Sequence, residues 1–187
     1  MNVIVAVTGA SGSVYAKLLI EELIRFRSEG QVKKVSLVLS EKAKEVWTHE
    51  IGIVPNDFPF TTYENDNFYA PFASGSSLYD VMIVCPCSMG TMGKIANGIS
   101  DTLIARAADV IIKERRRLIL SIRETPIHLI HIDNMQKLSQ AGVIIAPASP
   151  SFYSRPRSLE DLAMTVVDRL LQLAGLKKET YRWGEND

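Results

Sequence analysis

The stretch that decides the fold is Val3-Ile4-Val5-Ala6-Val7, which runs directly into Thr8-Gly9-Ala10-Ser11-Gly12-Ser13. A continuous apolar run is typical of a buried strand, and the small residues after it are typical of a tight turn into a helix. The first turn of such a helix offers free backbone N–H groups and the positive end of the helix dipole, so its default ligand is a phosphate. The Gly-x-x-Gly spacing differs from the Gly-x-Gly-x-x-Gly of dinucleotide folds, which indicates an NAD site only weakly. A tight turn without a ligand is the alternative.

The composition bounds the class of protein. The chain has 187 residues, 47% of them apolar and 22% charged, and its 21 basic and 21 acidic side chains cancel. We therefore expect one globular domain over residues 1–187 and no general nucleic-acid binding. No apolar run is long enough to cross a bilayer, and the first strand lacks the flanks of a signal peptide. Cys85 and Cys87 would point to opposite faces of a strand, which rules out a disulfide between them. Together these features predict a cytoplasmic protein.

Apolar strands alternate with amphipathic helices along the chain. We expect strands at 3–7, 35–39, 81–84, 118–122 and 143–146, and helices at 12–28, 41–49, 91–113 (with a break near Gly98), 127–141 and 158–174. Residues 52–78 carry several prolines and read as a long irregular loop of the kind that is often functional. Continuously apolar strands that are each followed by a helix predict an α/β fold: a Rossmann-like, three-layer sandwich around a mainly parallel sheet.

Small, hydroxyl and charged residues follow the expected strands. In parallel α/β folds ligands bind outside the carboxyl ends of the strands, so these loops should share one edge of the sheet. The loops are Gly9–Ser13, Ser40, Cys87–Thr91, Arg123–Pro126 and Pro147–Arg157. They predict a ligand site at that edge.

Two of these loops allow a structural interpretation beside the functional one. Ser88, Met89, Gly90 and Thr91 repeat the logic of the opening turn and are expected either to face a ligand or to cap a helix. Arg123 is suited to a phosphate or a planar carbonyl edge, and a partly buried Glu124 beside it could trade protons. An ion pair between these two side chains is the alternative.

Structural roles compete with functional ones for the remaining reactive side chains. Lys113 either turns inward from the end of its helix or lies with Arg115 to Arg117 on a solvated face. Tyr153 either binds phosphate or packs within its loop. The cysteines are expected to be buried and structural rather than catalytic. His128 and His131 have no acidic third ligand at a suitable spacing, so no metal site is expected.

A set of motifs in a fixed order resembles the UbiX-type flavin prenyltransferases, formerly named aromatic acid decarboxylases. The resemblance covers nearly the whole chain. The motifs are Thr-Gly-Ala-Ser-Gly at 8–12, Cys-Pro-Cys-Ser-x-Gly-Thr at 85–91, Arg-Ala-Ala-Asp-Val at 106–110, Lys-Glu-Arg-Arg at 113–116, Arg-Glu-Thr-Pro at 123–126, Phe-Tyr-x-Arg-Pro at 152–156 and Arg-Trp-Gly-Glu at 182–185.

The resemblance implies a flavoprotein that binds FMN at the subunit junctions of a large homo-oligomer, a dodecamer. Such an enzyme joins the dimethylallyl group of dimethylallyl phosphate to N5 and C6 of reduced FMN without a metal. Its product, prenylated FMN, serves a separate UbiD-type decarboxylase, with a link to ubiquinone biosynthesis. Whether the donor is a phosphate or a pyrophosphate stays open.

The resemblance also implies roles for individual residues. The expected FMN contacts are Gly9, Ala10, Ser11, Ser40, Ser88, Met89, Gly90, Thr91 and Arg123. The expected contacts of the prenyl phosphate are Tyr153, Arg169 and Lys113, supported by Arg106. Catalytic roles fall to Glu50, Glu124 and Lys113. Ser74 belongs to the loop over the flavin, and Trp183 belongs to a C-terminal tail, 176–187, that closes near the substrate. The positive charges would stabilise the departing phosphate.

Two other functions compete with this one. FMN-dependent cysteine decarboxylases of the related flavoprotein group carry Pro-Ala-Ser-Ala-Asn-Thr where this chain has Pro86-Cys87-Ser88-Met89-Gly90-Thr91. A non-catalytic flavin carrier, or a partner subunit of a decarboxylase, would not need the prenyl-phosphate residues. The presence of Lys113, Glu124, Tyr153 and Arg169 together favours catalysis.

Overall fold

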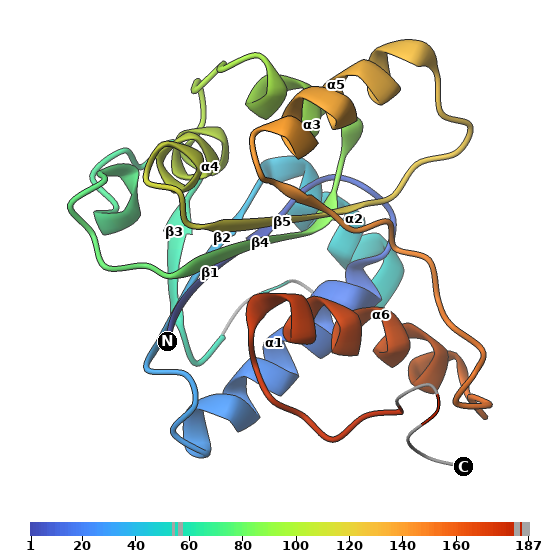
Figure 1. Cartoon of the computed structure of the whole chain (residues 1–187). Coiled ribbons are helices and arrows are strands. Elements are labelled where there is room, and N and C mark those ends of the chain that lie inside the picture. The colour runs from blue at the N-terminus through green and yellow to red at the C-terminus, as the bar shows by residue number, and fades with distance from the viewer. Residues whose placement is uncertain (54, 56–57, 182–183, 185–187) are drawn as a thin grey trace.

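The computed structural model describes residues 1–53, 55, 58–181 and 184. Its centre is a parallel sheet with the strand order β3-β2-β1-β4-β5-β6 (Figure 1). The strands are β1 (Asn2–Val7), β2 (Lys34–Leu39), β3 (Thr61–Glu64), β4 (Val81–Cys87), β5 (Arg117–Ile122) and β6 (Ile144–Ile145). Every neighbouring pair is parallel, so all carboxyl ends lie at one edge. The predicted α/β fold is confirmed.

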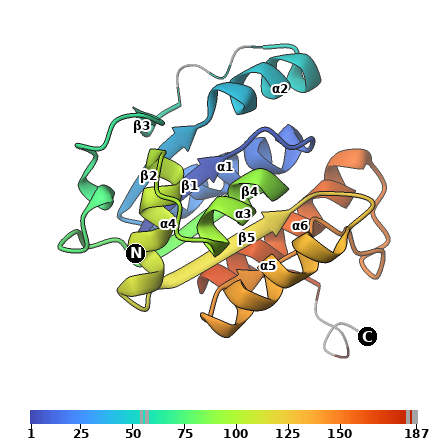
Figure 2. The same ribbon diagram turned by 90° about the horizontal axis from the view of Figure 1, so that it is seen from above.

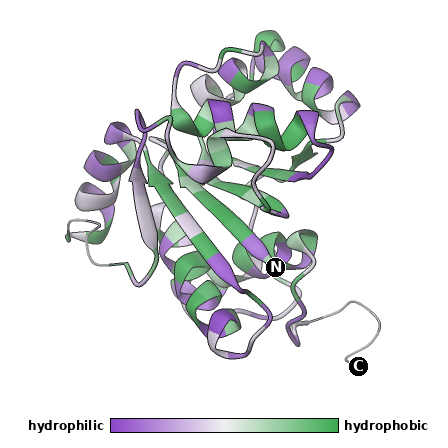
Figure 3. Ribbon diagram, turned by 90° about the vertical axis from the view of Figure 1, so that its left-hand side faces the viewer, coloured by the Kyte–Doolittle hydropathy of each residue, from purple (hydrophilic) through white to green (hydrophobic). Residues whose placement is uncertain are grey.

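Helices cover both faces of this sheet (Figures 1 and 2). They are α1 (Ser13–Ser28), α2 (Glu41–Ile51), α3 (Met89–Ala96), α4 (Leu103–Lys113), α5 (Leu129–Gln140) and α6 (Leu159–Ala174), with a short 3-10 helix, η1, at Pro71–Ala73. Alternate residues of β1 enter two separate cores. Val3, Val5 and Val7 pack with α1, α2 and α6, whereas Ile4 and Ala6 pack with α3, α4 and α5. Figure 3 shows the apolar residues concentrated in the central strands.

The elements differ from the expectation where the sequence signal is polar or interrupted. β3, Thr61-Thr62-Tyr63-Glu64, lies in the stretch expected to be irregular, because an exposed edge strand needs no apolar run. β4 continues through Pro86 to Cys87, and a register shift against β5 accommodates the proline. The break expected near Gly98 within 91–113 is confirmed, since α3 ends at Ala96 and α4 begins at Leu103. β6 has only two residues.

Three helices that start at the carboxyl edge have N-termini capped by serine side chains. Ser40, Ser88 and Ser158 accept from the backbone N–H groups of Ala43, Thr91 and Asp161, which satisfies donors that a helix start leaves open. None of the described helices is both long and apolar enough to span a membrane.

Candidate functional site

Hydrogen bonds join the turns at the carboxyl edge into one surface. Buried Thr8 donates its Oγ1–H to the carbonyl oxygen of Pro86 (2.9 Å) and accepts from the backbone N–H of Ser88 (2.7 Å). The N–H of Ser40 donates to Val7 O (3.0 Å), and that of Arg123 donates to Cys87 O (3.4 Å). The turns after β1, β2, β4 and β5 therefore lie side by side, as the positions of the predicted loops required.

The first turn of α1 already holds an anion, which is the carboxylate of Glu50 from α2. Its Oε2 accepts from the N–H of Ser13 (2.7 Å) and of Gly12 (3.0 Å). Partial burial raises the pKa of Glu50, but the hydrogen bonds from Ser11, Ser13 and Gly12 outweigh it and leave the pKa below its usual value. Glu50 thus occupies the N–H groups of Gly12 and Ser13, while the FMN contacts expected at Gly9, Ala10 and Ser11 stay a prediction.

Two glycines in the opening turn are required by close packing. A Cβ at Gly9 would lie 2.6 Å from the Cβ of Lys42, so the turn could not approach α2 as it does. Gly12 has a φ of 116°, which disfavours other residues, and a Cβ there would lie 2.8 Å from the ring of Tyr15. Tyr15, whose ring lies against this turn, was not singled out by the sequence analysis. Burial raises its pKa, with Cys85 and Arg123 near enough to influence it.

The turns that carry Ser40 and Ser88, called the hydroxyl turns below, cap helices and also include exposed residues. Ser88 Oγ accepts from the N–H of Thr91 and donates to its Oγ1 (3.1 Å), so the capping interpretation of Ser88 is confirmed. Ser40 caps α2 in the same way. Gly90 is exposed, and a Cβ there would meet open space, while Met89 is buried. Capping fixes these turns in place without closing the space in front of them.

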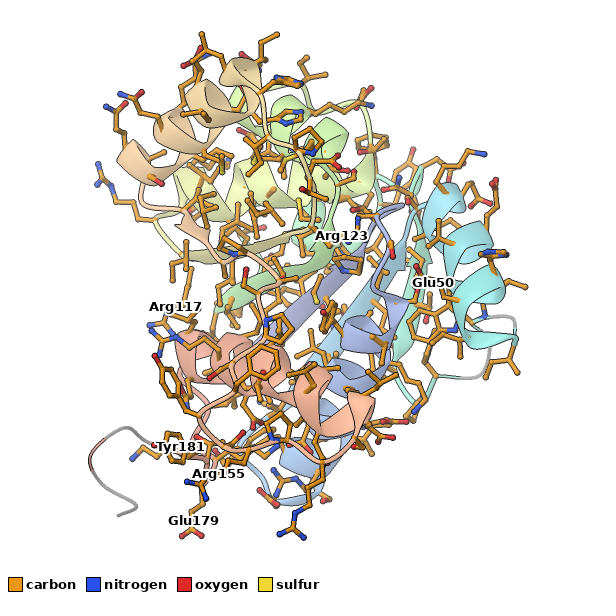
Figure 4. All side chains as sticks on the ribbon, turned by 90° about the vertical axis from the view of Figure 1, so that its right-hand side faces the viewer. Glu50, Arg117, Arg123, Arg155, Glu179 and Tyr181 are labelled. Carbon is orange, nitrogen blue, oxygen red and sulfur yellow. The ribbon has the colours of Figure 1, made fainter. Side chains whose placement is uncertain are left out.

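Arg123 and Glu124 are exposed directly after β5. Among the described residues neither forms an ion pair, and Glu124 accepts only from the neighbouring N–H of Thr125 (3.0 Å). The alternative of an ion pair between Arg123 and Glu124 is therefore wrong. Figure 4 shows Arg123 and Glu50 on the same side of the molecule, so a guanidinium and a carboxylate lie at this edge.

Tyr153 and Arg169 line one cavity of about 300 Å³ between α6 and the loop after β6. Tyr181 closes the other side, with its ring nearly parallel to that of Tyr153 and 6.5 Å away between centroids. A hydrogen-bond chain holds Arg169: its Nη1 donates to Gln172, which in turn donates to Thr180 (2.6 Å). The resemblance had paired Arg169 with Tyr153 as contacts of the prenyl phosphate, and both line this cavity, whereas Tyr181 had been given no role.

The segment before Tyr181 is anchored to the body of the protein. Lys178 pairs with Asp168 (2.6 Å) and Glu22 (3.0 Å), all three side chains being largely buried. Leu176 is buried as well. The first part of the predicted closing tail therefore packs on α1 and α6 beside the cavity. Trp183 lies outside the described residues.

A third group lies on α4, away from the carboxyl edge. Arg106 donates to Ala73 O (3.0 Å) and Asp109 (3.2 Å), next to exposed Ser74. Lys113 is the last residue of α4, exposed, and 3.7 Å from Glu114. It is exposed where β5 begins, so of the two alternatives for Lys113 the solvated face is observed, and its contact with the prenyl phosphate stays a prediction. A single copy of the chain does not bring this group to Arg123 and Glu124.

The cysteines are structural. Cys85 and Cys87 are free, fully buried and belong to the cores on opposite faces of the sheet. Burial raises the pKa of Cys85 to about 12 and that of Cys87 further, which leaves both as neutral thiols. In the part of the chain that the structure describes, no group of three His, Cys, Asp or Glu side chains is arranged to hold a metal ion.

Comparisons with known proteins identify the family of the chain. A family model described as "Flavoprotein" matches residues 1–171. The flavin prenyltransferase UbiX of Thermoplasma acidophilum is 45% identical over 98% of this chain and 100% of its own. The crystal structure of AnUbiX (PadA1) in complex with FMN and dimethylallyl pyrophosphate is 38% identical with a TM-score of 0.88, covering 97% of this chain and 98% of that one.

A dodecameric FMN-dependent UbiX-like decarboxylase from Escherichia coli O157:H7 is also similar, at 36% identity and a TM-score of 0.88 over 97% of this chain and 99% of that one. The epidermin biosynthesis protein EpiD from Staphylococcus aureus is more distant, with 25% identity and a TM-score of 0.58 over 81% and 85%. The chain thus belongs to the flavoprotein family and, within it, to the UbiX flavin prenyltransferases.

Proposed function

We propose that this protein transfers the dimethylallyl group of dimethylallyl phosphate to N5 and C6 of reduced FMN. The observation that carries the proposal is the joined carboxyl edge, where exposed Arg123 and Glu124 follow β5 next to the hydrogen-bonded hydroxyl turns. The related crystal structure with FMN and dimethylallyl pyrophosphate supports the pair of substrates. The proposed product is prenylated FMN, and its proposed recipient is a UbiD-type decarboxylase.

The donor set at the carboxyl edge fits a flavin mononucleotide. Arg123 supplies a guanidinium fork, and Ser11, Ser40 and Thr91 supply hydroxyl groups beside the open space at Gly90. Because Glu50 holds the N–H groups of Gly12 and Ser13, we place the FMN phosphate on the hydroxyl and guanidinium donors. Reduced FMN supplies the nucleophilic N5 and C6 positions. Arg123 and the turns would hold the flavin still.

The prenyl phosphate is proposed to bind at Tyr153 and Arg169. Their cavity of about 300 Å³ is at the small end of ligand sites, in keeping with a five-carbon donor. Cleavage of the allylic carbon–oxygen bond places negative charge on the departing phosphate. Arg169, Tyr153 and Lys113 would stabilise that charge, which needs no metal when preorganised donors are aimed at it. Glu124, exposed and without an ion pair among the described residues, would move the protons.

Lys113 and Arg106 would reach this site from another copy of the chain. Both lie on α4 and contact Glu114, Ala73 or Asp109 rather than the turns of their own carboxyl edge. The dodecameric relative from Escherichia coli supports assembly of this kind. Apolar residues exposed on and near α5, which include Ile127, Leu129 and Ile130, offer surface for such contacts. We therefore propose a homododecamer with sites shared between copies.

The decisive experiment is anaerobic incubation with reduced FMN and either dimethylallyl phosphate or dimethylallyl pyrophosphate. Mass spectrometry of the extracted flavin would show an added five-carbon unit with the true donor. An unmodified flavin with both donors, from protein that binds FMN, would refute the proposed reaction. Gain of mass with only the pyrophosphate would revise the donor and keep the reaction class.

A further inference from the structure

An open groove of about 740 Å³ lies at the amino edge of the sheet, where the strands begin. Arg115, Arg116 and Arg117 line it between α4 and β5, together with Met1, Asp80, Val81, Gly142, Ile144 and Ala174. These three consecutive arginines were expected to form a solvated face. The groove shows that they do not simply point into solvent.

Helix ends at this edge account for part of the positive charge. α4, α5 and α6 all end here, so their last carbonyl groups bring partial negative charge. Arg117 answers one of them by donating its Nη1–H to Ala174 O (2.7 Å). Arg116 donates its Nη2–H to Gly75 O (2.8 Å). Through these two hydrogen bonds, Arg116 and Arg117 contribute to the structure of this edge.

Other guanidinium N–H groups of the three arginines have no acceptor among the described residues. Nη1 of Arg116 is buried and has no hydrogen-bond partner there. The guanidinium of Arg115 makes no ion pair or side-chain hydrogen bond within the described part of the chain. Asp80 is the one carboxylate in the described lining, and its Oδ2 accepts from the N–H of Asn2 (2.6 Å). The groove therefore keeps a surplus of positive charge and of unused N–H donors.

We propose that this groove binds a phosphate-bearing anion. Guanidinium groups match phosphate oxygens with paired N–H donors, and the exposed guanidinium of Arg115, without an ion pair among the described residues, is available to such an acceptor. The polar, positively charged lining disfavours a cation or an apolar ligand. The ligand chemistry is that of a phosphate or a diphosphate group.

Within one copy of the chain, the groove is separate from the carboxyl edge and the cavity proposed for the reaction. Figure 4 shows Arg117 on the side of the molecule away from Glu50 and Arg123. Its described lining includes none of the residues assigned to the flavin or to the prenyl phosphate, Lys113 among them. A ligand here would contact none of those residues within its own copy, so its expected effect is on stability or assembly.

Isothermal titration with inorganic phosphate and with inorganic pyrophosphate tests this site in the full chain. Arg115 has a φ of 54°, and asparagine tolerates this left-handed conformation well, so Arg115→Asn removes the charge without straining the backbone. We expect Arg115→Asn to weaken one binding event about tenfold, as the loss of a charge-assisted hydrogen bond predicts, and Arg115→Lys to weaken it less. Lys17→Gln, which removes an exposed charge on α1, should leave it unchanged.

Arg169→Gln separates this event from binding in the Tyr153 cavity. The amino-edge event should persist in Arg169→Gln and weaken in Arg115→Asn. Tighter binding of pyrophosphate than of phosphate would identify a diphosphate, and equal binding a single phosphate; either result supports the site. Binding in Arg115→Asn that equals the parent protein, with an unchanged unfolding midpoint, would overturn the proposal, as would loss of all binding in Arg169→Gln.

Discussion

At the carboxyl edge of the sheet the helices begin, whereas at the amino edge they end. At the carboxyl edge, side-chain oxygens accept hydrogen bonds from the free N–H groups of the helix N-termini. These acceptors belong to Ser40, Ser88 and Glu50. At the amino edge, Arg117 donates to the carbonyl group that ends α6, and Arg116 donates to the loop carbonyl of Gly75. Many polar side chains at each edge are therefore already engaged in hydrogen bonds to the backbone. Ligand sites are then indicated by what capping leaves over: Arg123 at one edge, and Arg115 with Nη1 of Arg116 at the other.

The largest expected effect concerns the division of the reaction between two copies. Glu124→Gln and Lys113→Gln should each lower prenyl transfer by at least about a hundredfold, because each removes a proton-transferring group or a charge on the leaving phosphate. If the carboxyl edge of one copy works with α4 of another, randomly mixed oligomers of the two variants should regain about a quarter of the parent activity. Co-expression with two affinity tags and turnover assays of the doubly purified protein would measure this.

FMN binding serves as the control for both variants. Glu124→Gln should bind FMN nearly as well as the parent protein, since Arg123 and the turns remain. Mixed oligomers without any regained activity would show that Lys113 and Glu124 do not act in different copies. Undiminished turnover in Glu124→Gln alone would remove Glu124 from the mechanism.

The next effect concerns the hydrogen bonds by which Thr8 joins the turns after β1 and β4, called the joint below. Thr8→Val keeps the shape of a buried side chain but removes the donor to Pro86 and the acceptor for Ser88, so the N–H of Ser88 loses its partner. Unfolding free energy should fall by about 2 kcal/mol, and the unfolding midpoint by about 5 °C. Thermal unfolding by circular dichroism would show it. Thr48→Val, the same change at an exposed helical position, should have little effect; equal losses would mean that the joint adds nothing.

The sequence predicts the carboxyl edge better than it predicts the cavity beside it. Apolar runs before Gly9, Ser40, Ser88 and Arg123 place those residues at strand ends, because parallel strands share one direction. The occupant of the α1 N-terminus was not predictable, since Glu50 is distant in sequence and lies on an exposed part of α2. Helical periodicity gives the exposed face of α6 but not its neighbours, so it could not place Arg169 opposite Tyr153 or bring in Tyr181.

The same reasoning explains the misjudged elements. β3 is polar because it is an edge strand, and its pattern cannot be told from a loop. Lys113 shares its motif with Glu114, yet motif membership carries no direction in space. The end of α4 and the beginning of β5 fix Lys113 at the amino edge of its own chain.

A smaller effect separates the cavity of α6 from the flavin turns. Arg169→Gln should raise the KM for the prenyl donor about tenfold, the equivalent of one charge-assisted hydrogen bond, and leave FMN affinity unchanged. Steady-state kinetics with varied donor, together with fluorescence titration of FMN, would measure both. Arg27→Gln on α1 is the matched control, since it removes an exposed arginine outside the cavity. A loss of FMN affinity in Arg169→Gln that equals the rise in KM would place Arg169 at the flavin.

The smallest effect concerns the anion that the chain itself supplies to α1. Glu50→Gln keeps an amide oxygen but loses the charge, so at pH 7 the unfolding free energy should fall by less than about 1 kcal/mol. The pKa of Glu50 is lower in the folded chain than its ordinary value of 4.5. The ionised carboxylate therefore stabilises the fold above about pH 4.5, and this contribution is lost as the pH falls through the folded-state pKa.

The difference in stability between the parent protein and Glu50→Gln should consequently shrink below pH 4.5, as measured by urea unfolding at several pH values. Glu45→Gln is the control, because Glu45 is exposed and pairs with Lys42 at 2.7 Å without touching α1. If the difference kept the same size from pH 7 to pH 3.5, the charge of Glu50 would not hold the turn. The N–H groups of Gly12 and Ser13 would then be available to a ligand phosphate, and the carboxyl edge would have to be read as open at α1 as well.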